Sequence, residues 1–275
     1  MSTHDNFTQY VLPTYGRFPI VPEKAAGAYL WDDQGKKYLD FCTGIAVCSI
    51  GHCHPKLVSA IQDQAAKLMH CSNLYEIPQQ AELAKRIVED FVEIPGKVFF
   101  SNSGAEANEG LIKLARKFGV ATPAADGAAR TEVITFRNSF HGRTMATLTA
   151  TGQDGIQEGF APLLPGVNYA IYNDLESVKA QINDKTTAIL LEPLQGEGGI
   201  IAATAEFLNG LSALCKEHNL LLMFDEVQAG FGRLGHNMAW RAIAPDVQPD
   251  AISWAKGLGG GFPIGAFWVN DREIS

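Results

Sequence analysis

Short apolar runs alternate with helix-forming segments along most of this sequence, and this alternation restricts the fold more than any other feature. Two runs, TAILLEP (187–193) and LLLMFDE (220–226), are apolar at almost every position, so the strands they form are expected to be buried on both faces. Helical segments such as GAEANEGLIKLARKFG (104–119) and ATAEFLNGLSALCKEHN (203–219) lie between the runs. The pattern predicts an α/β fold with a mostly parallel sheet sandwiched by helices. The remaining predicted strands are KVFFS (97–101), EVITF (132–136), NYAIY (168–172), DAISWA (250–255) and IGAFWV (264–269).

The region before residue 55 has a different pattern. AYLWDDQGKKYLDF (28–41) predicts a β-hairpin that turns at Asp33 to Gly35, and PTYGRFPI (13–20) predicts an extended arm. We therefore assign residues 1–54 to an N-terminal arm and hairpin segment, part of a small domain, and residues 55–275 to a large domain. Within the large domain, helices are predicted in 54–70 and 78–92, the first entered through Pro55.

Composition excludes several classes of protein. The chain has 275 residues, 46% of them hydrophobic, which is enough to bury a sizeable core. Its 22 basic and 30 acidic residues give a net charge of -8 without a basic stripe, so a nucleic-acid partner is not expected. Because residues 1–20 lack the features of a secretory signal and no run of 18 apolar residues occurs, we expect a cytoplasmic protein without a membrane partner.

The cysteines are expected to be free thiols. Four of the five, Cys42, Cys48, Cys53 and Cys71, lie within a stretch of thirty residues, and we expect no secretory signal from residues 1–20. The stretch CSIGHCHP (48–55) combines cysteine and histidine, which zinc accepts as ligands. Three neighbouring residues cannot all point at one ion, however, and no second ligand pair completes a site. We predict no metal there.

Polar residues follow the predicted strands at the edge where ligands bind in parallel α/β sheets. After 97–101, Ser103, Gly104 and Ala105 lead directly into a helix, whose free N–H groups and dipole suit a phosphate. A simple capping turn explains this motif equally well. After 187–191, the stretch EPLQGEGG (192–199) contains Glu192 and Glu197, whose spacing does not show that they face each other.

After 132–136, the stretch RNSFHGRT (137–144) combines Phe140, His141 and Arg143. A phenyl ring can cover a flat heterocycle, and a guanidinium can hold a carboxylate through two parallel hydrogen bonds. The alternative is a surface loop whose arginine pairs with an acid.

An acid closes the strand predicted at 220–226, and a lysine follows the strand predicted at 250–255. Asp225 closes an apolar strand, where an acid is costly unless a cation meets it, and Gln228 follows three residues later. Lys256 lies in WAKGLGGGFPIG (254–265), where the glycines follow the lysine. A phosphate-binding P-loop places its glycines before the lysine, which argues against a nucleotide site. A phosphate cradle, a ring cover, a buried acid and a lysine together fit pyridoxal phosphate, with the lysine as Schiff-base partner and the acid at the pyridine nitrogen.

Five motifs in this order, SNSGAEANE, SFHGRT, EPLQGEGG, FDEVQAGFGR and AKGLGGGFPIG, resemble the class III, ornithine-type aminotransferases of fold type I. The resemblance covers residues 10–275. It implies pyridoxal 5′-phosphate as cofactor and residues 55–275 as the cofactor-binding large domain. The implied catalytic residues are Lys256, which carries the cofactor and moves the proton, and Asp225 at the pyridine nitrogen. The implied cofactor-binding residues are Lys256, Asp225, Gln228 at the phenolic oxygen, Phe140 on the ring, Ser103, Gly104 and Ala105 at the phosphate, and Glu226 and Val227.

The resemblance also implies substrates and partners. Arg143 would hold the substrate α-carboxylate, and Glu197 would tune which amine enters. PTYGRFPI and SFHGRT are most similar to the acetylornithine branch of the family, which implies transfer of the δ-amino group of N-acetylornithine to 2-oxoglutarate in arginine biosynthesis. Ornithine, succinylornithine and 4-aminobutyrate stay open as alternative donors.

A homodimer is the implied assembly. Family members continue beyond the strand that follows the lysine, so the chain is expected to be truncated and to lack the C-terminal small domain. Two alternatives lie outside the enzyme class. One is an inactive fragment that binds the cofactor or dimerises, and the other is a nucleotide-binding module.

Overall fold

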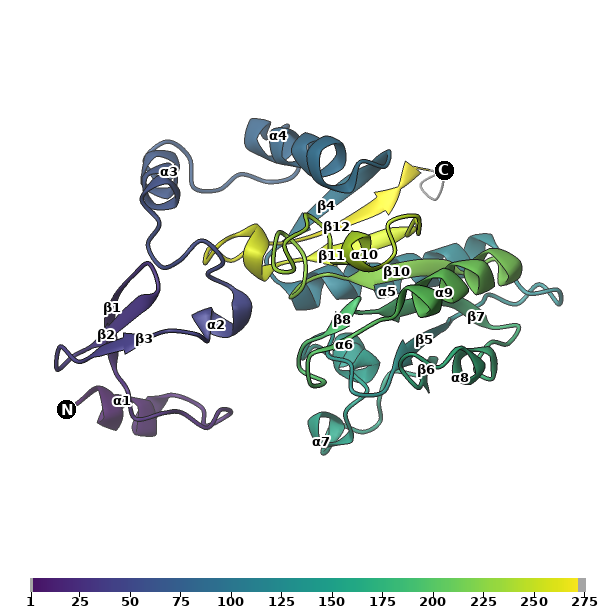
Figure 1. Cartoon of the computed structure of the whole chain (residues 1–275), viewed down its shortest axis with the longest axis horizontal. Coiled ribbons are helices and arrows are strands. Elements are labelled where there is room, and N and C mark those ends of the chain that lie inside the picture. The colour runs from purple at the N-terminus through teal and green to yellow at the C-terminus, as the bar shows by residue number, and fades with distance from the viewer. Residues whose placement is uncertain (1, 272–275) are drawn as a thin grey trace. The chain divides into compact units, whose positions relative to one another are not determined.

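The computed structural model describes residues 2–271 and separates the chain into two compact units (Figure 1). The first unit ends at His70 and the second begins at Cys71. Residues 55–70, which include helix α3 (Pro55–Ala65), thus group with the first unit. The assignment of domains on either side of residue 54 stays a prediction.

The second unit is built around a seven-stranded sheet with the order β4-β12-β11-β10-β7-β5-β6. The pairs formed by β11, β10, β7, β5 and β6 are parallel, whereas β12 runs antiparallel to both of its neighbours, β11 and β4. The sheet is therefore mostly parallel, as predicted. Its strands are β4 (Gly96–Ser101), β5 (Glu132–Phe136), β6 (Val167–Ala170), β7 (Thr186–Leu191), β10 (Leu221–Asp225), β11 (Ala251–Trp254) and β12 (Gly265–Asn270).

Helices cover both faces of this sheet, which explains why its central strands are apolar throughout. Successive side chains of β7 point to opposite faces. Ile189 and Leu191 belong to one core cluster, together with residues of helix α9 (Ala205–His218). Ala188 and Leu190 belong to a second cluster, together with residues of helix α5 (Gly104–Ala121). Figure 1 shows these two helices on opposite sides of the sheet.

The helices of the second unit confirm most of the predicted segments. The segment predicted over 78–92 is helical, but it continues from an α-helix into a π-helical turn, η1 (Ile87–Val92). Two short strands, β8 (Leu194–Gln195) and β9 (Ile201–Ala202), form a small separate ladder. The remaining helices are α4 (Pro78–Arg86), α6 (Met145–Ala150), α7 (Asp154–Gln157), α8 (Leu175–Lys179), α10 (Ala239–Ile243) and the 3₁₀ turn η2 (Lys256–Leu258).

The first unit contains the predicted hairpin. Strands β2 (Tyr29–Asp32) and β3 (Lys37–Leu39) pair antiparallel around the turn, and β1 (Pro22–Ala26) completes a three-stranded sheet. Helix α1 (Thr3–Tyr10), which sequence analysis did not predict, precedes the extended arm, and the short helix α2 (Thr43–Ala46) follows the sheet.

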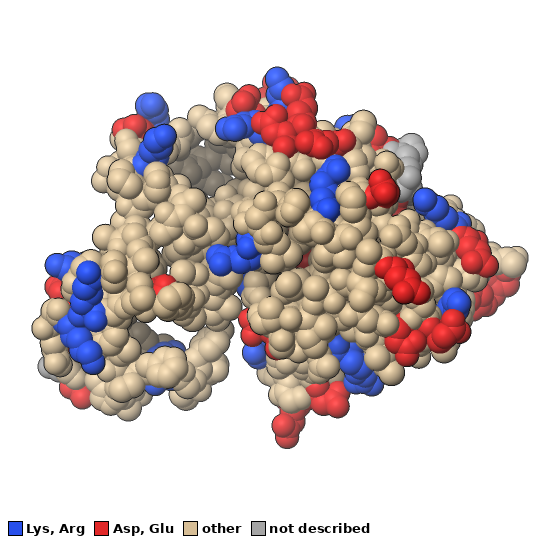
Figure 2. Space-filling model, in the orientation of Figure 1, with Lys and Arg blue, Asp and Glu red and all other residues tan. Residues whose placement is uncertain are grey.

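The Cys/His stretch of the first unit makes a hydrogen bond to an acid. His52 lies 2.6 Å from the Asp40 carboxylate, and this hydrogen bond is the largest of the contacts that lower the pKa of Asp40. All five cysteines are free, as predicted. On the face shown in Figure 2, acidic and basic side chains are interspersed over the second unit without a continuous basic stripe. No helix in residues 2–271 combines the length and the apolar character of a membrane span.

Candidate active site

The ends of β10 and β11 bring the predicted acid and lysine to the same edge of the sheet. The two strands are parallel neighbours, with Asp225 in register with Ser253, and Lys256 begins the turn η2 just after β11. A cavity of about 270 Å³ opens at this edge. It is lined by every predicted site residue except Ser103 and Glu226, namely by Gly104, Ala105, Phe140, Arg143, Glu197, Asp225, Val227, Gln228 and Lys256.

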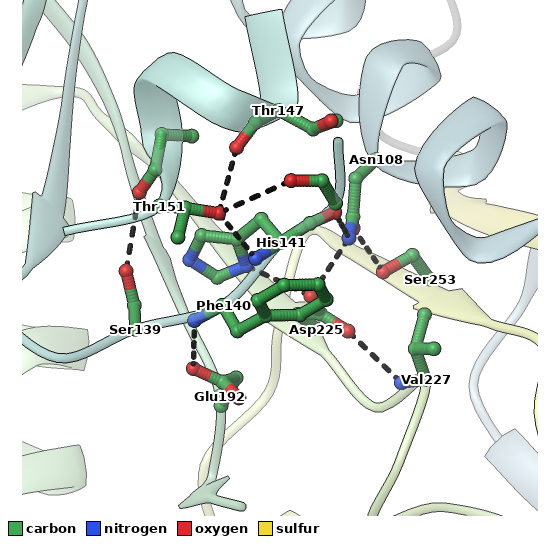
Figure 3. A network of polar contacts seen from close by, with 12 residues as sticks. Asn108, Ser139, Phe140, His141, Thr147, Thr151, Glu192, Asp225, Val227 and Ser253 are labelled. Atoms are coloured by element: carbon green, nitrogen blue, oxygen red, sulfur yellow. Dashed lines mark hydrogen bonds and ion pairs between the residues drawn. The ribbon is translucent and has the colours of Figure 1, made fainter. Parts of the chain in front are cut away.

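Asp225 lies at the centre of a buried polar network (Figure 3). Its Oδ2 accepts hydrogen bonds from Nδ2 of Asn108 at 2.7 Å and from Nδ1 of His141 at 2.8 Å, and its Oδ1 accepts one from the Val227 N–H at 2.9 Å. The Asp225 side chain is only 3% exposed. A buried carboxylate is tolerated when donors surround it in this way. The cationic partner expected for Asp225 is met in part by His141, a group that is charged only when protonated.

Lys256 is held in a strained backbone conformation beside this acid. Its φ of +41° lies in the left-handed region that side-chain-bearing residues rarely adopt. The N–H groups of Gly259 and Gly260 donate to its carbonyl at 3.1 and 3.2 Å and hold the turn. Burial lowers the pKa of the ammonium, and the charges of Asp225 and other carboxylates only partly oppose this. More of the neutral, nucleophilic amine is therefore present near neutral pH than for an exposed lysine.

The first turn of α5 presents backbone donors to the cavity. Ser103 is the N-cap, and its hydroxyl accepts from the Glu106 N–H at 3.2 Å, so its side chain serves the helix. The N–H groups of Gly104 and Ala105 belong to the first turn, which has no preceding helical carbonyls to bond. A Cβ atom at Gly104 would lie 2.8 Å from a methyl of Val227, so only glycine allows the helix to start this close to the end of β10.

Phe140 and Arg143 lie on the loop after β5. The Phe140 N–H donates to Oε2 of Glu192 at 3.1 Å, which ties this loop to the segment after β7. The guanidinium of Arg143 lies 5.6 Å from the Phe140 ring centroid, and its side chain is exposed. Burial, followed by the charge of Asp225, raises the pKa of Glu192 well above its usual value. Both predicted carboxylates, Glu192 and Glu197, line the cavity.

Gln228 and Glu197, which both line the cavity, are hydrogen-bonded to each other. Nε2 of Gln228 donates to Oε1 of Glu197 at 3.2 Å. A Cβ atom at position 196 would lie 1.6 Å from the Gln228 side-chain oxygen, so any larger residue there would displace the end of the Gln228 side chain. The glycine turn of EPLQGEGG therefore leaves space for Gln228 in the position that it adopts.

The side chain of Glu226 lies outside the cavity. Its carboxylate accepts from the N–H groups of Ala239 and Trp240 at 2.9 and 2.8 Å, which caps helix α10. Burial raises the pKa of Glu226 to about 7, and the two backbone donors partly offset that shift. Contact of Glu226 and Ser103 with a cofactor stays a prediction.

Several residues of the site belong to no predicted site motif or had no predicted role. Asn108 lies inside a helical segment and Ser253 inside a predicted strand, so neither stood out as a motif. Both are buried and belong to the Asp225 network. His141 was part of a motif but had no predicted role. Asn108 and Ser253 could have been found as polar residues among the apolar positions of their helix and strand, because a buried polar side chain needs a partner.

Comparison with known proteins confirms the family resemblance carried by the motifs. The family model of aminotransferase class-III matches residues 10–274. The acetylornithine aminotransferase of Caldanaerobacter subterraneus subsp. tengcongensis is 51% identical over 96% of this chain and 66% of its own length. That of Gloeobacter violaceus is 49% identical over 98% of this chain and 66% of its own length.

Solved structures show the same fold. An ornithine aminotransferase from Toxoplasma gondii matches with a TM-score of 0.90 and 30% identity over 98% of this chain and 63% of its own. The N-acetylornithine aminotransferase from Stenotrophomonas maltophilia matches with a TM-score of 0.79 and 40% identity over 94% and 64%. The chain thus spans slightly less than two thirds of the length of these relatives. By the family match and the shared motifs, the chain belongs to the class III aminotransferases.

Proposed function

We propose that this chain supplies the cofactor site of an acetylornithine aminotransferase, which transfers the δ-amino group of N2-acetyl-L-ornithine to 2-oxoglutarate. The products are N-acetyl-L-glutamate 5-semialdehyde and L-glutamate. The observation that carries the proposal is the meeting of Lys256 and Asp225 in one cavity at the ends of neighbouring parallel strands. The names of two curated relatives, 51% and 49% identical, support the choice of substrate.

The residues of the cavity fit pyridoxal 5′-phosphate, the cofactor of class III aminotransferases. The N–H groups of Gly104 and Ala105 at the start of α5 suit a phosphate, and the glycine at 104 keeps that helix end open. Asp225, buried and hydrogen-bonded as a carboxylate, suits a protonated ring nitrogen. Lys256 supplies an amine whose pKa is lowered by burial.

When bound, pyridoxal phosphate supplies an aldehyde that takes up amino groups and a ring that accepts electrons from the substrate carbon. The chain's own residues do the rest. Lys256 Nζ would be the attachment point for the aldehyde and, as a free amine, the base that moves a proton. Phe140 would lie against the ring, and Gln228 would donate to the phenolic oxygen. Asp225 would keep the ring nitrogen protonated.

Two charged side chains at the cavity are proposed to select the substrate. Arg143 is exposed, and we assign it the α-carboxylate that N-acetylornithine, glutamate and 2-oxoglutarate share. Glu197 lines the same cavity and is assigned to tuning which amine enters. The Arg143 guanidinium lies near the Phe140 ring, and Glu197 accepts a hydrogen bond from Gln228.

Ornithine is the second candidate donor, because the ornithine aminotransferase of Toxoplasma gondii has a TM-score of 0.90 to this chain. Succinylornithine and 4-aminobutyrate are further ω-amines to test. A homodimer and a cytoplasmic location are parts of the same proposal.

The test is an absorption spectrum of the purified protein with pyridoxal phosphate, before and after each of the four amines, followed by borohydride reduction and peptide mapping. We expect a visible absorption band that bleaches fastest with N-acetylornithine, and a reduced adduct that maps to Lys256. Faster bleaching with ornithine would make ornithine the preferred donor in place of N-acetylornithine. A band that no amine bleaches would show that the chain binds the cofactor without turnover, and an adduct on another residue would contradict the proposed site.

A further inference from the structure

Asn108 makes three hydrogen bonds at the floor of the cavity, and each reaches a different element (Figure 3). Its Nδ2 donates to Oδ2 of Asp225 on β10 at 2.7 Å and to the carbonyl of His141 in the loop after β5 at 2.8 Å. Its Oδ1 accepts from the hydroxyl of Ser253 on β11 at 2.6 Å. Asn108 itself comes from α5 and is 1% exposed. A single amide therefore joins four segments that surround the site.

The chemistry of the partners fixes the orientation of this amide. A carboxylate and a backbone carbonyl only accept hydrogen bonds, so both must face the NH₂ group. The Ser253 hydroxyl can donate, so it faces the oxygen. Turning the amide over would bring Oδ1 against two acceptors and leave buried groups unpaired, which is costly. The Asn108 side chain is therefore locked in one orientation.

The contact with Ser253 links the acid to the strand that carries the lysine. Ser253 is the residue of β11 that lies in register with Asp225 of β10. Lys256 follows three residues later, in a turn whose backbone is strained. A backbone held in such a conformation depends on well-fixed surroundings. The Asn108 amide fixes the two neighbouring strand ends relative to each other through their side chains.

We infer that Asn108 is a positioning residue: it holds the Asp225 carboxylate in the orientation needed for the cofactor ring nitrogen and ties Asp225 to the strand that delivers Lys256. This inference rests on the proposed function for its ligand. It differs from a packing role, because a side chain of similar shape without hydrogen bonds would pack in the same space but would not hold the carboxylate.

The test compares binding of pyridoxal phosphate with binding of 1-deaza-pyridoxal phosphate, which has carbon in place of the ring nitrogen. Only the natural cofactor can use the charge of Asp225. The dissociation constant of the 1-deaza analogue divided by that of pyridoxal phosphate therefore measures that contact alone. In Asn108→Leu we expect this ratio to fall at least about tenfold, as for loss of a hydrogen bond to a charged group. Ser253→Ala, which removes only the contact to β11, should give a smaller fall, about threefold.

The matched control is Asn209→Leu on α9, where the exposed amide donates to the Ala205 carbonyl one turn earlier. Its ratio should equal that of the wild-type protein. If Asn108→Leu weakens both ligands equally and keeps the ratio, Asn108 merely packs and the inference is overturned. If Asn108→Leu does not fold, the Ser253→Ala ratio decides, and an unchanged ratio there overturns the link to β11.

A cofactor-free measurement separates this inference from the proposed function. A double-mutant cycle of Asn108→Leu and Asp225→Leu on the free energy of unfolding should give a clear coupling, because each change leaves the other partner unpaired. Failure of the wild-type protein to bind pyridoxal phosphate would defeat the proposed function. Absence of coupling would defeat the contact between Asn108 and Asp225, whatever the cofactor result.

Discussion

The side-chain amide of Gln228 donates a 3.2 Å hydrogen bond to Oε1 of Glu197, and the same side chain lies against the backbone at Gly196. A Cβ atom at Gly196 would lie 1.6 Å from the Gln228 oxygen, which is the end of a flexible side chain. A substitution there should therefore leave the fold intact and displace Gln228.

Gly196→Ala is the first prediction. The displaced Gln228 can no longer reach the phenolic oxygen that we assign to it, so the affinity for pyridoxal phosphate should fall about tenfold. Fluorescence titration measures this affinity. Gly155→Ala, at a position where nothing lies within 4 Å of the added Cβ, is the control and should bind as the wild type does. Equal affinities in the two variants would show that Gln228 does not contact the cofactor.

The second prediction concerns Lys256. Lys256→Ala removes the only nucleophile proposed for the cofactor aldehyde. Borohydride reduction should therefore attach no cofactor to the protein, while weak non-covalent binding persists. Transaminase activity should fall by at least about 1,000-fold, as for loss of a central catalytic residue. Lys216→Ala, on the exposed face of α9, should keep both properties. A visible band and a reduced adduct that survive in Lys256→Ala would move the attachment to another lysine.

Much of the sheet and of the site could be predicted, because both depend on patterns with clear physical meaning. Apolar runs without polar alternation indicate strands buried on both sides, and β7 and β10 confirm this. In a parallel sheet the carboxyl ends of the strands meet, so Asp225 and Lys256 were expected to lie together, and they do.

Other features are not encoded in local pattern. The apolar run at 264–269 predicts a strand but not its direction, and β12 runs antiparallel to both of its neighbours, β11 and β4. The role of Asn108 depends on three partners that are distant in sequence. Glu226 follows Asp225, and since successive side chains of an extended chain point to opposite sides, its carboxylate leads away from the cavity to α10. Strand alternation could have predicted that separation.

The third prediction follows from the buried carboxyl of Glu226. In the folded protein its pKa is about 7, against a usual value of 4.5, because burial disfavours the charged form. Between these two values the folded state binds more protons than the unfolded state, so the free energy of unfolding decreases as the pH rises through this window. The shift corresponds to about 3 kcal/mol in all.

Glu226→Gln should remove that decrease, because an amide does not titrate and its oxygen still accepts from one backbone N–H. Denaturant unfolding from pH 4.5 to pH 8 should show the wild type losing stability relative to the variant. Glu206→Gln, an exposed acid in the first turn of α9, controls for the loss of one negative charge. Parallel stability profiles for the wild type and Glu226→Gln would rule out the raised pKa.

The last prediction concerns Arg130, a guanidinium that is 7% exposed at the edge of the sheet opposite the site. It donates to the Thr122 carbonyl at 2.7 Å, the Asn219 carbonyl at 3.0 Å and the Thr186 carbonyl at 3.1 Å. Thr122 and Asn219 cap the C-termini of α5 and α9, where carbonyls lack helical partners and a positive charge is favourable. Arg130 thus joins the two helices that cover opposite faces of the sheet.

Arg130→Met keeps the volume and much of the apolar stem but leaves the buried Thr186 carbonyl and the two C-cap carbonyls without this donor. The free energy of unfolding should fall by about 3 kcal/mol, since the buried carbonyl loses a partner and the two helix ends lose a favourable positive charge. Arg86→Met, which breaks only an exposed i,i+4 pair with Asp90, should cost less than about 1 kcal/mol. Denaturant unfolding at neutral pH measures both variants. If both lose the same stability, water or a local shift replaces the guanidinium, and Arg130 does not hold α5 and α9 to the sheet.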